Sequence, residues 1–248
     1  MSDKIVKLRS TVKRSTAKRS TAKRKSGAAG HSRADYVKER ILKAIQAGRY
    51  KPGERIRETE VAEWLDVSRT PVREALRRLE SEAILTFVSW RGVVVAELDR
   101  QQVGELYAMR EVLEGAAARL AARHIYDAET DLLDDLLRRA DACPDKPDEL
   151  ARLNRQFHQT IYAAAHNRYL TQTLVQIRNA MALLQGTTYS VPGRPDTAAA
   201  EHRDILNAIR ERNPDAAEAA ASTHIAAAQR ARLQLLMETD NSTDEDMP

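Results

Sequence analysis

The stretch of sequence that decides the fold is residues 67–79, which read VSRTPVREALRRL. Ser68 stands where a helix N-cap belongs, and Pro71 falls in the first turn, where its missing N–H costs nothing. The apolar positions are Val72, Ala75, Leu76 and Leu79, and the basic positions are Arg69, Arg73 and Arg77. This spacing predicts an amphipathic helix that buries one face and presents arginines on another.

The segments on either side complete a small domain. Residues 58–65 predict a short helix that ends at a tight turn, Asp66-Val67, and residues 36–45 predict an earlier helix. After the arginine helix, residues 84–95 contain two β-prone runs around a short loop with Gly92, which is typical of a hairpin. The order of helix, helix, turn, helix and hairpin predicts a winged helix-turn-helix.

The rest of the chain is helical in pattern. Aromatic residues are only 4% of the sequence, and Gly and Pro together number seventeen, which favours a mainly α protein. Six helices are predicted, at about 100–124, 128–142, 147–165, 168–188, 197–211 and 214–237, and the prolines at 144, 147, 192, 195 and 214 fall between helices or at their starts. The fold expected is therefore mainly α, with an N-terminal winged helix-turn-helix, its small β-hairpin wing, and a C-terminal all-α bundle of six helices.

Charge is distributed unevenly along the chain. Residues 1–31 carry a net charge of +9, residues 32–98 carry +2 and residues 99–248 carry −7. Polyanion binding is therefore expected at the basic end only. The single cysteine, Cys143, excludes an intrachain disulfide, and no apolar run is long enough to span a bilayer. We expect a cytoplasmic protein that is associated with the nucleoid and with no membrane.

The arginine helix carries the features of a DNA-reading element. Ser68, Arg69 and Thr70 stand at its N-terminus, the end that enters the major groove in helix-turn-helix proteins. Arg69 and Arg73 are four residues apart on one face, and arginine is the usual bidentate reader of guanine. A solvated basic face would give the same stripe, but the preceding helix and turn and the following wing favour DNA recognition.

Two stretches resemble a known family. Residues 69–79, RTPVREALRRL, with Gly92 in the wing, resemble the GntR family of bacterial transcription regulators. Residues 107–117, YAMREVLEGAA, resemble the start of the effector domain in its FadR subfamily, and six helices are closest to the VanR-like branch. The resemblance implies a dimeric, ligand-responsive regulator, in most members a repressor, that binds a palindromic double-stranded DNA operator and is not an enzyme.

The resemblance also assigns domains and DNA contacts. It implies a DNA-binding domain at 32–98 and an effector-binding (FCD) and dimerisation domain at 99–238, between a disordered basic tail (1–31) and an acidic frayed tail (239–248). The family's DNA contacts correspond to Ser68, Arg69, Thr70, Arg73 and Gly92. Some members carry an arginine where this chain has Thr59, so the operator preference at that contact differs.

Histidines mark a candidate metal site in the helical region. Asn154 and His158 are four apart on one predicted helix, and His202 and His224 belong to two others. Such a set can surround one ion, as helix bundles commonly do. From the residues alone, the alternative of hydrogen-bonded core or surface histidines stays open.

The resemblance implies that these four residues are the metal ligands, for a divalent ion of the Zn, Ni or Mn type. Asp is the more usual residue at the position of Asn154. Because three imidazoles and an amide are all neutral, the ion needs an anionic ligand, which a small organic carboxylate effector would supply. Arg110 is a candidate second clamp on that carboxylate, and a structural ion pair with Glu111 or Glu114 is an equal alternative.

Some of these features also occur in proteins of other classes. A metal hydrolase needs a general base near the bound water, and the only acid adjacent to a proposed ligand is Glu201, which a helix points elsewhere. An architectural, nucleoid-associated protein would work through the repeat KRSTAKRSTAKRK at residues 13–25. That repeat can follow phosphates but has no means of reading bases. A tail that binds RNA or a protein partner is a third interpretation.

Overall fold

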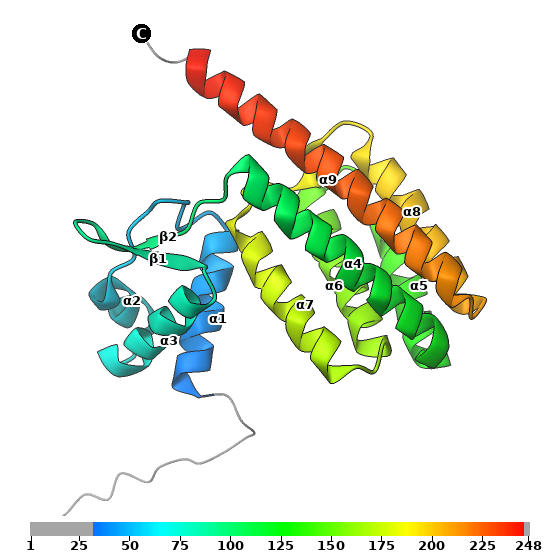
Figure 1. The fold of residues 1–248 in the computed structure, drawn as a ribbon, viewed down its shortest axis with the longest axis horizontal. Helices are drawn as coiled ribbons and strands as arrows, with labels where there is room; N and C mark the ends of the chain where they lie inside the picture. Colours follow the sequence, from blue (N-terminus) through cyan, green and yellow to red (C-terminus); the bar gives the residue numbers. More distant parts are fainter. Residues whose placement is uncertain (1–31, 246–248) are drawn as a thin grey trace, which may run out of the picture. The chain divides into compact units, whose positions relative to one another are not determined.

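The computed structural model describes the backbone of residues 32–245 and the side chains of residues 32–238 (Figure 1). The expected basic tail, with its KRSTA repeat, lies outside the described residues. The expected acidic tail overlaps the end of the last helix, and its final three residues also lie outside the described part of the chain. The described residues, from Ser32 onward, form one compact unit.

The first part of this unit is the winged helix-turn-helix, and the prediction is confirmed. It consists of α1 (Arg33–Gln46), α2 (Glu58–Leu65), α3 (Arg69–Ser81), β1 (Leu85–Val88) and β2 (Gly92–Val95). The strands pair antiparallel, with Leu85 opposite Val95 and Val88 opposite Gly92. Its core is formed by buried Val37, Ile41, Ile45, Val61, Val72, Leu76, Leu79 and Leu85.

Local chemistry explains these boundaries. At the start of α1, the Ser32 hydroxyl accepts the Asp35 N–H, and the Asp35 carboxylate accepts the Ser32 N–H. Asp66 ends α2 in the left-handed conformation (φ 50°), which aspartate tolerates better than most residues and which makes the turn before α3. Gly92 has φ 85°, and an added Cβ would also lie 3.4 Å from Nε of Arg55.

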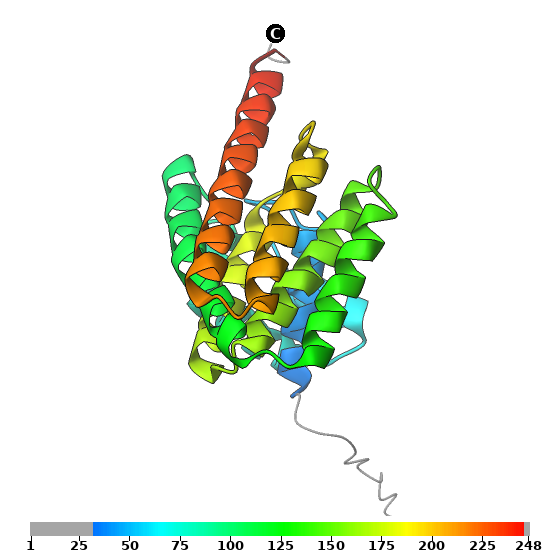
Figure 2. The same cartoon turned by 90° about the vertical axis from the view of Figure 1, so that its right-hand side faces the viewer.

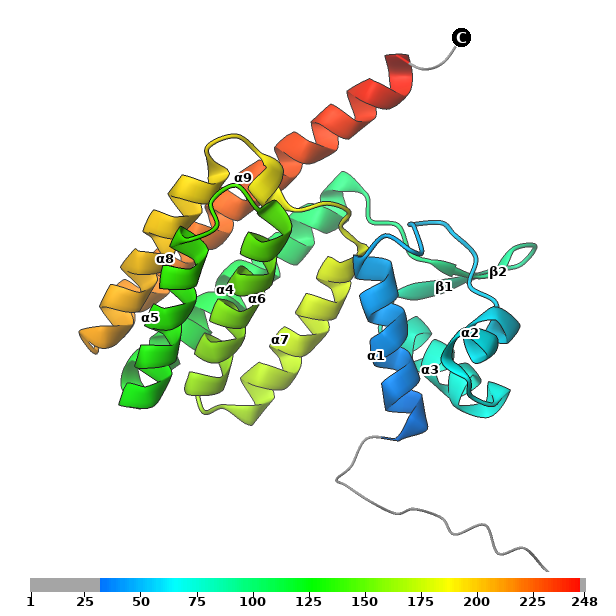
Figure 3. The same cartoon turned by 180° about the vertical axis from the view of Figure 1, so that it is seen from behind.

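The second part is a bundle of six α-helices, as predicted for the described residues. They are α4 (Arg100–His124), α5 (Asp127–Asp141), α6 (Pro147–Ala164), α7 (Arg168–Ala180), α8 (Arg194–Arg210) and α9 (Pro214–Glu245). Helix α4 packs along α9 and α9 along α8 (Figures 1 and 2). From behind, α5, α6 and α7 follow one another (Figure 3).

Small residues bring α4 and α9 close together. A Cβ added to Gly115 would lie 3.1 Å from Oγ of Ser222, so a larger residue there would require Ser222 or the helices to shift. The core beneath them includes Leu133, Leu153, Phe157, Ile161, Leu174, Ile205, Leu206 and Ile209. Among the described residues, no helix is both long and apolar enough to cross a membrane.

The helix predicted at 168–188 is wrong in its second half. Helix α7 ends at Ala180, and two short 3₁₀ turns follow, η1 (Met181–Leu183) and η2 (Thr188–Ser190). Leu184 is extended and Gly186 has φ 68°, so the backbone cannot continue as a helix. Ala182 and Leu183 are buried in the apolar cluster of the winged helix, which shows that tertiary packing overrides helix propensity here. Helix α8 also begins at Arg194, three residues before the predicted start.

Candidate functional sites

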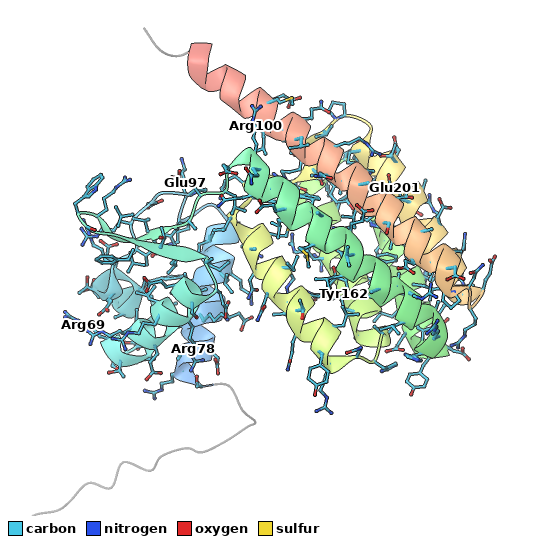
Figure 4. All side chains as sticks on the ribbon, viewed as in Figure 1. Arg69, Arg78, Glu97, Arg100, Tyr162 and Glu201 are labelled. Atoms are coloured by element: carbon cyan, nitrogen blue, oxygen red, sulfur yellow. The ribbon has the colours of Figure 1, made fainter. Side chains whose placement is uncertain are left out.

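The N-terminus of α3 presents the polar side chains predicted to contact DNA. Ser68, Arg69, Thr70 and Arg73 are all exposed. The Ser68 hydroxyl makes no capping hydrogen bond, and φ and ψ of −69° and 162° place this residue outside the helix. Arg69 projects into solvent (Figure 4). The backbone N–H groups, the helix dipole and these side chains together form a site suited to a phosphate.

Arg73 has a partner that sequence reasoning missed. Its Nε and one terminal nitrogen donate to the two carboxylate oxygens of Glu58, each at 3.0 Å. These hydrogen bonds lower the pKa of Glu58 and fix the plane of the guanidinium. Glu58 is the first residue of α2, fifteen residues earlier, and only the packing of α2 on α3 brings the pair together.

The wing ends in an exposed aromatic residue. Trp90 is 81% exposed, and the guanidinium of Arg91 lies 5.3 Å from the centre of its ring. Gly92 follows directly as the first residue of β2. The wing therefore offers a flat apolar surface beside a cation, next to the predicted DNA contact.

Three of the four predicted metal ligands, the histidines, converge in the helical bundle. His158 of α6, His202 of α8 and His224 of α9 are all buried, and one ring nitrogen of each lies within 4.8 Å of the others. The Nε2 atoms of His158 and His224 are 3.2 Å apart. Two imidazoles bound to one tetrahedral ion at about 2.05 Å would be about 3.3 Å apart, so this spacing suits adjacent ligands.

Two carboxylates orient these imidazoles from behind. Nδ1 of His158 lies 2.8 Å from Oε2 of Glu114, and Nδ1 of His224 lies 2.7 Å from Oε2 of Glu201. Each carboxylate is in turn held by an arginine: Arg110 donates to Glu114 and Arg194 donates to Glu201, both at 2.8 Å. Glu201 lies where α8 and α9 run side by side (Figure 4). Carboxylates placed in this way set the tautomer, leaving Nε2 free to bind a metal ion.

The protonation of the cluster also suits a metal ion. Burial, followed by the charges of neighbouring groups, lowers the pKa of His202 and of His224 well below the ordinary value. Both imidazoles are therefore neutral at neutral pH, as ligands must be. Burial opposes the charge of Glu114, yet Arg110 and His158 hold its pKa well below the usual range.

Two unsatisfied atoms show that the site fits an ion. Nε2 of His202 and Oδ1 of Asn154 are buried and have no hydrogen-bond partner among the described residues. A buried acceptor without a partner is costly, and a cation held by the three histidines would satisfy Nε2 of His202. Three imidazoles and one amide oxygen suit a borderline ion such as Zn²⁺ or Ni²⁺. His124 and His166 lie elsewhere, with Nδ1 of His124 3.2 Å from the carbonyl oxygen of Ala165.

A cavity of about 450 Å³ opens beside this cluster. Asn154, His158 and His224 line it, together with Arg110, Arg155, Arg178, Arg194 and Arg232. A volume of this size matches a small-molecule pocket. Arg110 reaches the cavity and is also paired with Glu114, so the two roles considered for it, clamp and structural ion pair, are compatible in geometry.

Glu114, Glu201 and Arg194 were not assigned to the site from the sequence. From the sequence, Glu114 was expected only as an ion-pair partner for Arg110, and Glu201 was considered only as a catalytic base and rejected. Both carboxylates come from helices other than the one that carries the histidine they contact. A search for acids near each proposed ligand would have found Glu201, whereas Glu114 depends on how α4 packs against α6.

The chain joins a winged helix, which exposes an arginine helix, to a helical bundle. The bundle contains a basic cavity and three histidines that could hold a metal ion. This combination defines the class of DNA-binding transcription regulators with a ligand-binding domain. Comparison with known protein families supports this class. Residues 33–95 match the model of the bacterial regulatory proteins of the gntR family, and residues 105–227 match the FCD domain.

The sequences and structures of similar proteins also indicate a transcription regulator. The chain is 32% identical over 181 residues to the HTH-type transcriptional regulator YdhC of Bacillus subtilis (strain 168), covering 72% of this chain and 81% of that one. It is 30% identical over 196 residues to a probable D-xylose utilization operon transcriptional repressor of Paenarthrobacter nicotinovorans, covering 78% and 86%. The solved structure of E. coli McbR/YncC has the same fold, with a TM-score of 0.75, 24% identity, and coverage of 84% of this chain and 100% of that one.

The chain therefore belongs to the GntR family of bacterial transcription regulators, with the FCD domain of its FadR-type members. The family assignment made from residues 69–79 and 107–117 is confirmed. Members of this family regulate transcription and are not enzymes, which confirms the expectation against a hydrolase.

Proposed function

We propose that this regulator is a repressor whose affinity for its operator depends on an organic carboxylate bound to a metal ion. In this proposal the domain at 32–98 reads DNA and the domain at 99–238 binds the effector and dimerises. The observation that carries the proposal is the cluster of three buried histidines, because two of them, His158 and His224, line a cavity that several arginines also line.

The effector's chemistry follows from the charge of the site. Asn154, His158, His202 and His224 are the proposed ligands, and none of them is anionic at neutral pH. A bound divalent ion would supply a positive charge that attracts one carboxylate. Arg110 lines the same cavity, and its guanidinium can donate to that carboxylate while its Nε remains on Glu114. An organic acid satisfies both groups at once.

On the DNA side, Arg69 and Arg73 are proposed to reach base edges in the major groove. Ser68 and Thr70 are proposed to contact phosphates, and Gly92 lets the wing approach the backbone. Because each winged helix reads only a half-site, a palindromic operator requires two copies of the chain.

Exposed apolar side chains support a homodimer. Met109 and Val112 on α4 are 47% and 65% exposed, and Val175 on the neighbouring helix α7 is 37% exposed. Exposed apolar residues on two helices that pack against one another suit contact with a second copy. Repression is supported by a relative whose name describes an operon repressor. The effector then acts through its different affinity for two arrangements of the dimer.

The experiment that tests the DNA half of this proposal is selection of binding sites from random DNA with the full-length protein. A palindromic site is expected. Replacing Arg73 (Arg73→Ala) should weaken binding to that site about 10- to 100-fold, because a good bidentate base contact discriminates by ~1–3 kcal/mol. Binding to unrelated DNA should change little. An equal loss on both DNAs would reject Arg73 as a base reader.

Deleting residues 1–31 separates this proposal from the architectural alternative. The shortened protein should keep its sequence preference and lose part of its salt dependence, because each phosphate contact steepens that dependence. If the sequence preference disappeared with the tail, the architectural interpretation would replace the one proposed.

A further inference from the structure

Two arginines on the cavity wall are not used by the metal centre. Arg155 of α6 and Arg178 of α7 both line the cavity, and neither makes a hydrogen bond or an ion pair within the part of the chain that the structure describes. Arg155 is exposed and Arg178 is half-buried. The other arginines on the wall are occupied: Arg110 holds Glu114, Arg194 holds Glu201, and Arg232 donates to the carbonyl groups of Gln185 and Gly186.

The acidic side chains that line the cavity do not balance its basic ones. Six basic and two acidic side chains of the described residues line it, before any metal ion is added. The two acids are Glu114, which Arg110 and His158 already occupy, and Asp148, which forms no ion pair with either arginine. A single carboxylate on the metal would therefore leave a large excess of positive charge in a partly enclosed space.

The two arginines are also placed within reach of one ligand. Arg155 is three residues before His158, so the two side chains lie on the same side of α6, about one turn apart. Arg178 comes from α7, the next helix along this wall, and the cavity has room for a molecule larger than one carboxylate.

We propose that the effector is a dianion, such as a small dicarboxylate, whose second anionic group is bound by Arg155 and Arg178 while the first lies at the histidine cluster. The inference rests on the proposed function, because it adds a second subsite to the same cavity. Guanidinium groups bind carboxylates with two parallel hydrogen bonds, so both arginines select for a second carboxylate over an alkyl end.

The test uses the full-length protein loaded with Zn²⁺ and a matched series of acids. The dicarboxylates succinate, glutarate, adipate and pimelate are each compared, by titration calorimetry, with the monocarboxylate of the same carbon number. At the chain length that spans the two subsites, the dicarboxylate should bind about tenfold tighter or more. Arg155→Gln and Arg178→Gln should each remove most of that advantage, weakening dicarboxylate binding much more than monocarboxylate binding.

Arg152→Gln is the matched control, since Arg152 belongs to α6 but pairs with Glu149 and does not line the cavity. It should bind every acid as the unmodified protein does. Equal affinity for both kinds of acid at every length, or an equal loss of both in the two arginine variants, would overturn the dianion inference and leave the proposed function standing. Failure of both series to bind the Zn²⁺-loaded protein would overturn the two together.

Discussion

Replacing Glu114 by glutamine (Glu114→Gln) removes one charge from the centre of the bundle and keeps the shape of the side chain. The side chains of Glu114 and Arg110 are only 3% and 11% exposed, and the carboxylate also contacts Nδ1 of His158 at 2.8 Å. Breaking a buried ion pair from one side costs about 3–5 kcal/mol, because the remaining charge is left without a partner. The amide still accepts one hydrogen bond, so we expect the lower end, about 3 kcal/mol.

The same substitution should weaken metal binding. A carboxylate that orients a ligating histidine typically contributes a factor of about 10–100 to metal affinity. Urea unfolding of the metal-free protein measures the first effect, and competition with a chelator for Zn²⁺ measures the second. Glu105→Gln is the control, because Glu105 is an exposed acid on the same helix. If Glu114→Gln matched this control in both measurements, the arrangement of Arg110, Glu114 and His158 would not have the role assigned to it.

Three further predictions concern protonation, assembly and DNA. Burial lowers the pKa values of His202 and His224, so the metal-free protein should reach its highest unfolding free energy above about pH 6.5. Below that pH the unfolding free energy should fall by up to about 1.4 kcal/mol per pH unit per histidine. Urea unfolding at several pH values measures this slope, and a flat profile would contradict the prediction. Val112→Glu should convert the dimer into monomers, which light scattering after gel filtration would detect as a halved molar mass. An unchanged molar mass would show that Val112 does not belong to the dimer interface. Glu58→Gln should reduce specific DNA affinity while changing stability by less than about 1 kcal/mol, since the pair with Arg73 is largely exposed; unchanged binding in a mobility-shift assay would contradict a positioning role.

The sequence predicted most of the fold because local patterns decide it. Residues 58–65 and 100–124 form helices with the predicted bounds. The first ends at Asp66 in the left-handed conformation, and the second begins at a capping box formed by Asp99 and Gln102. The break after Ala180 was not predictable, because it arises where Ala182 and Leu183 pack in the core of the winged helix. A window of sequence contains no information about that distant contact.

In the candidate sites as well, some residues could be predicted from the sequence and others depend on tertiary packing. The set of Asn154, His158, His202 and His224 followed from the family resemblance. The structure brings the three histidines together, and Asn154 lines the same cavity as His158 and His224. The partners Glu114 and Glu58 were missed as functional residues. Each meets its histidine or arginine only through the packing of one helix on another, 15 or more positions along the chain.

Metal analysis of the purified full-length protein, beside the variant His158→Ala, tests the buried histidine cluster most directly. We expect about one divalent ion per chain in the unmodified protein and almost none in the variant, because loss of one imidazole leaves too few ligands for a stable site. Equal and empty occupancy in both proteins would contradict the metal centre, and with it the metal-anchored carboxylate.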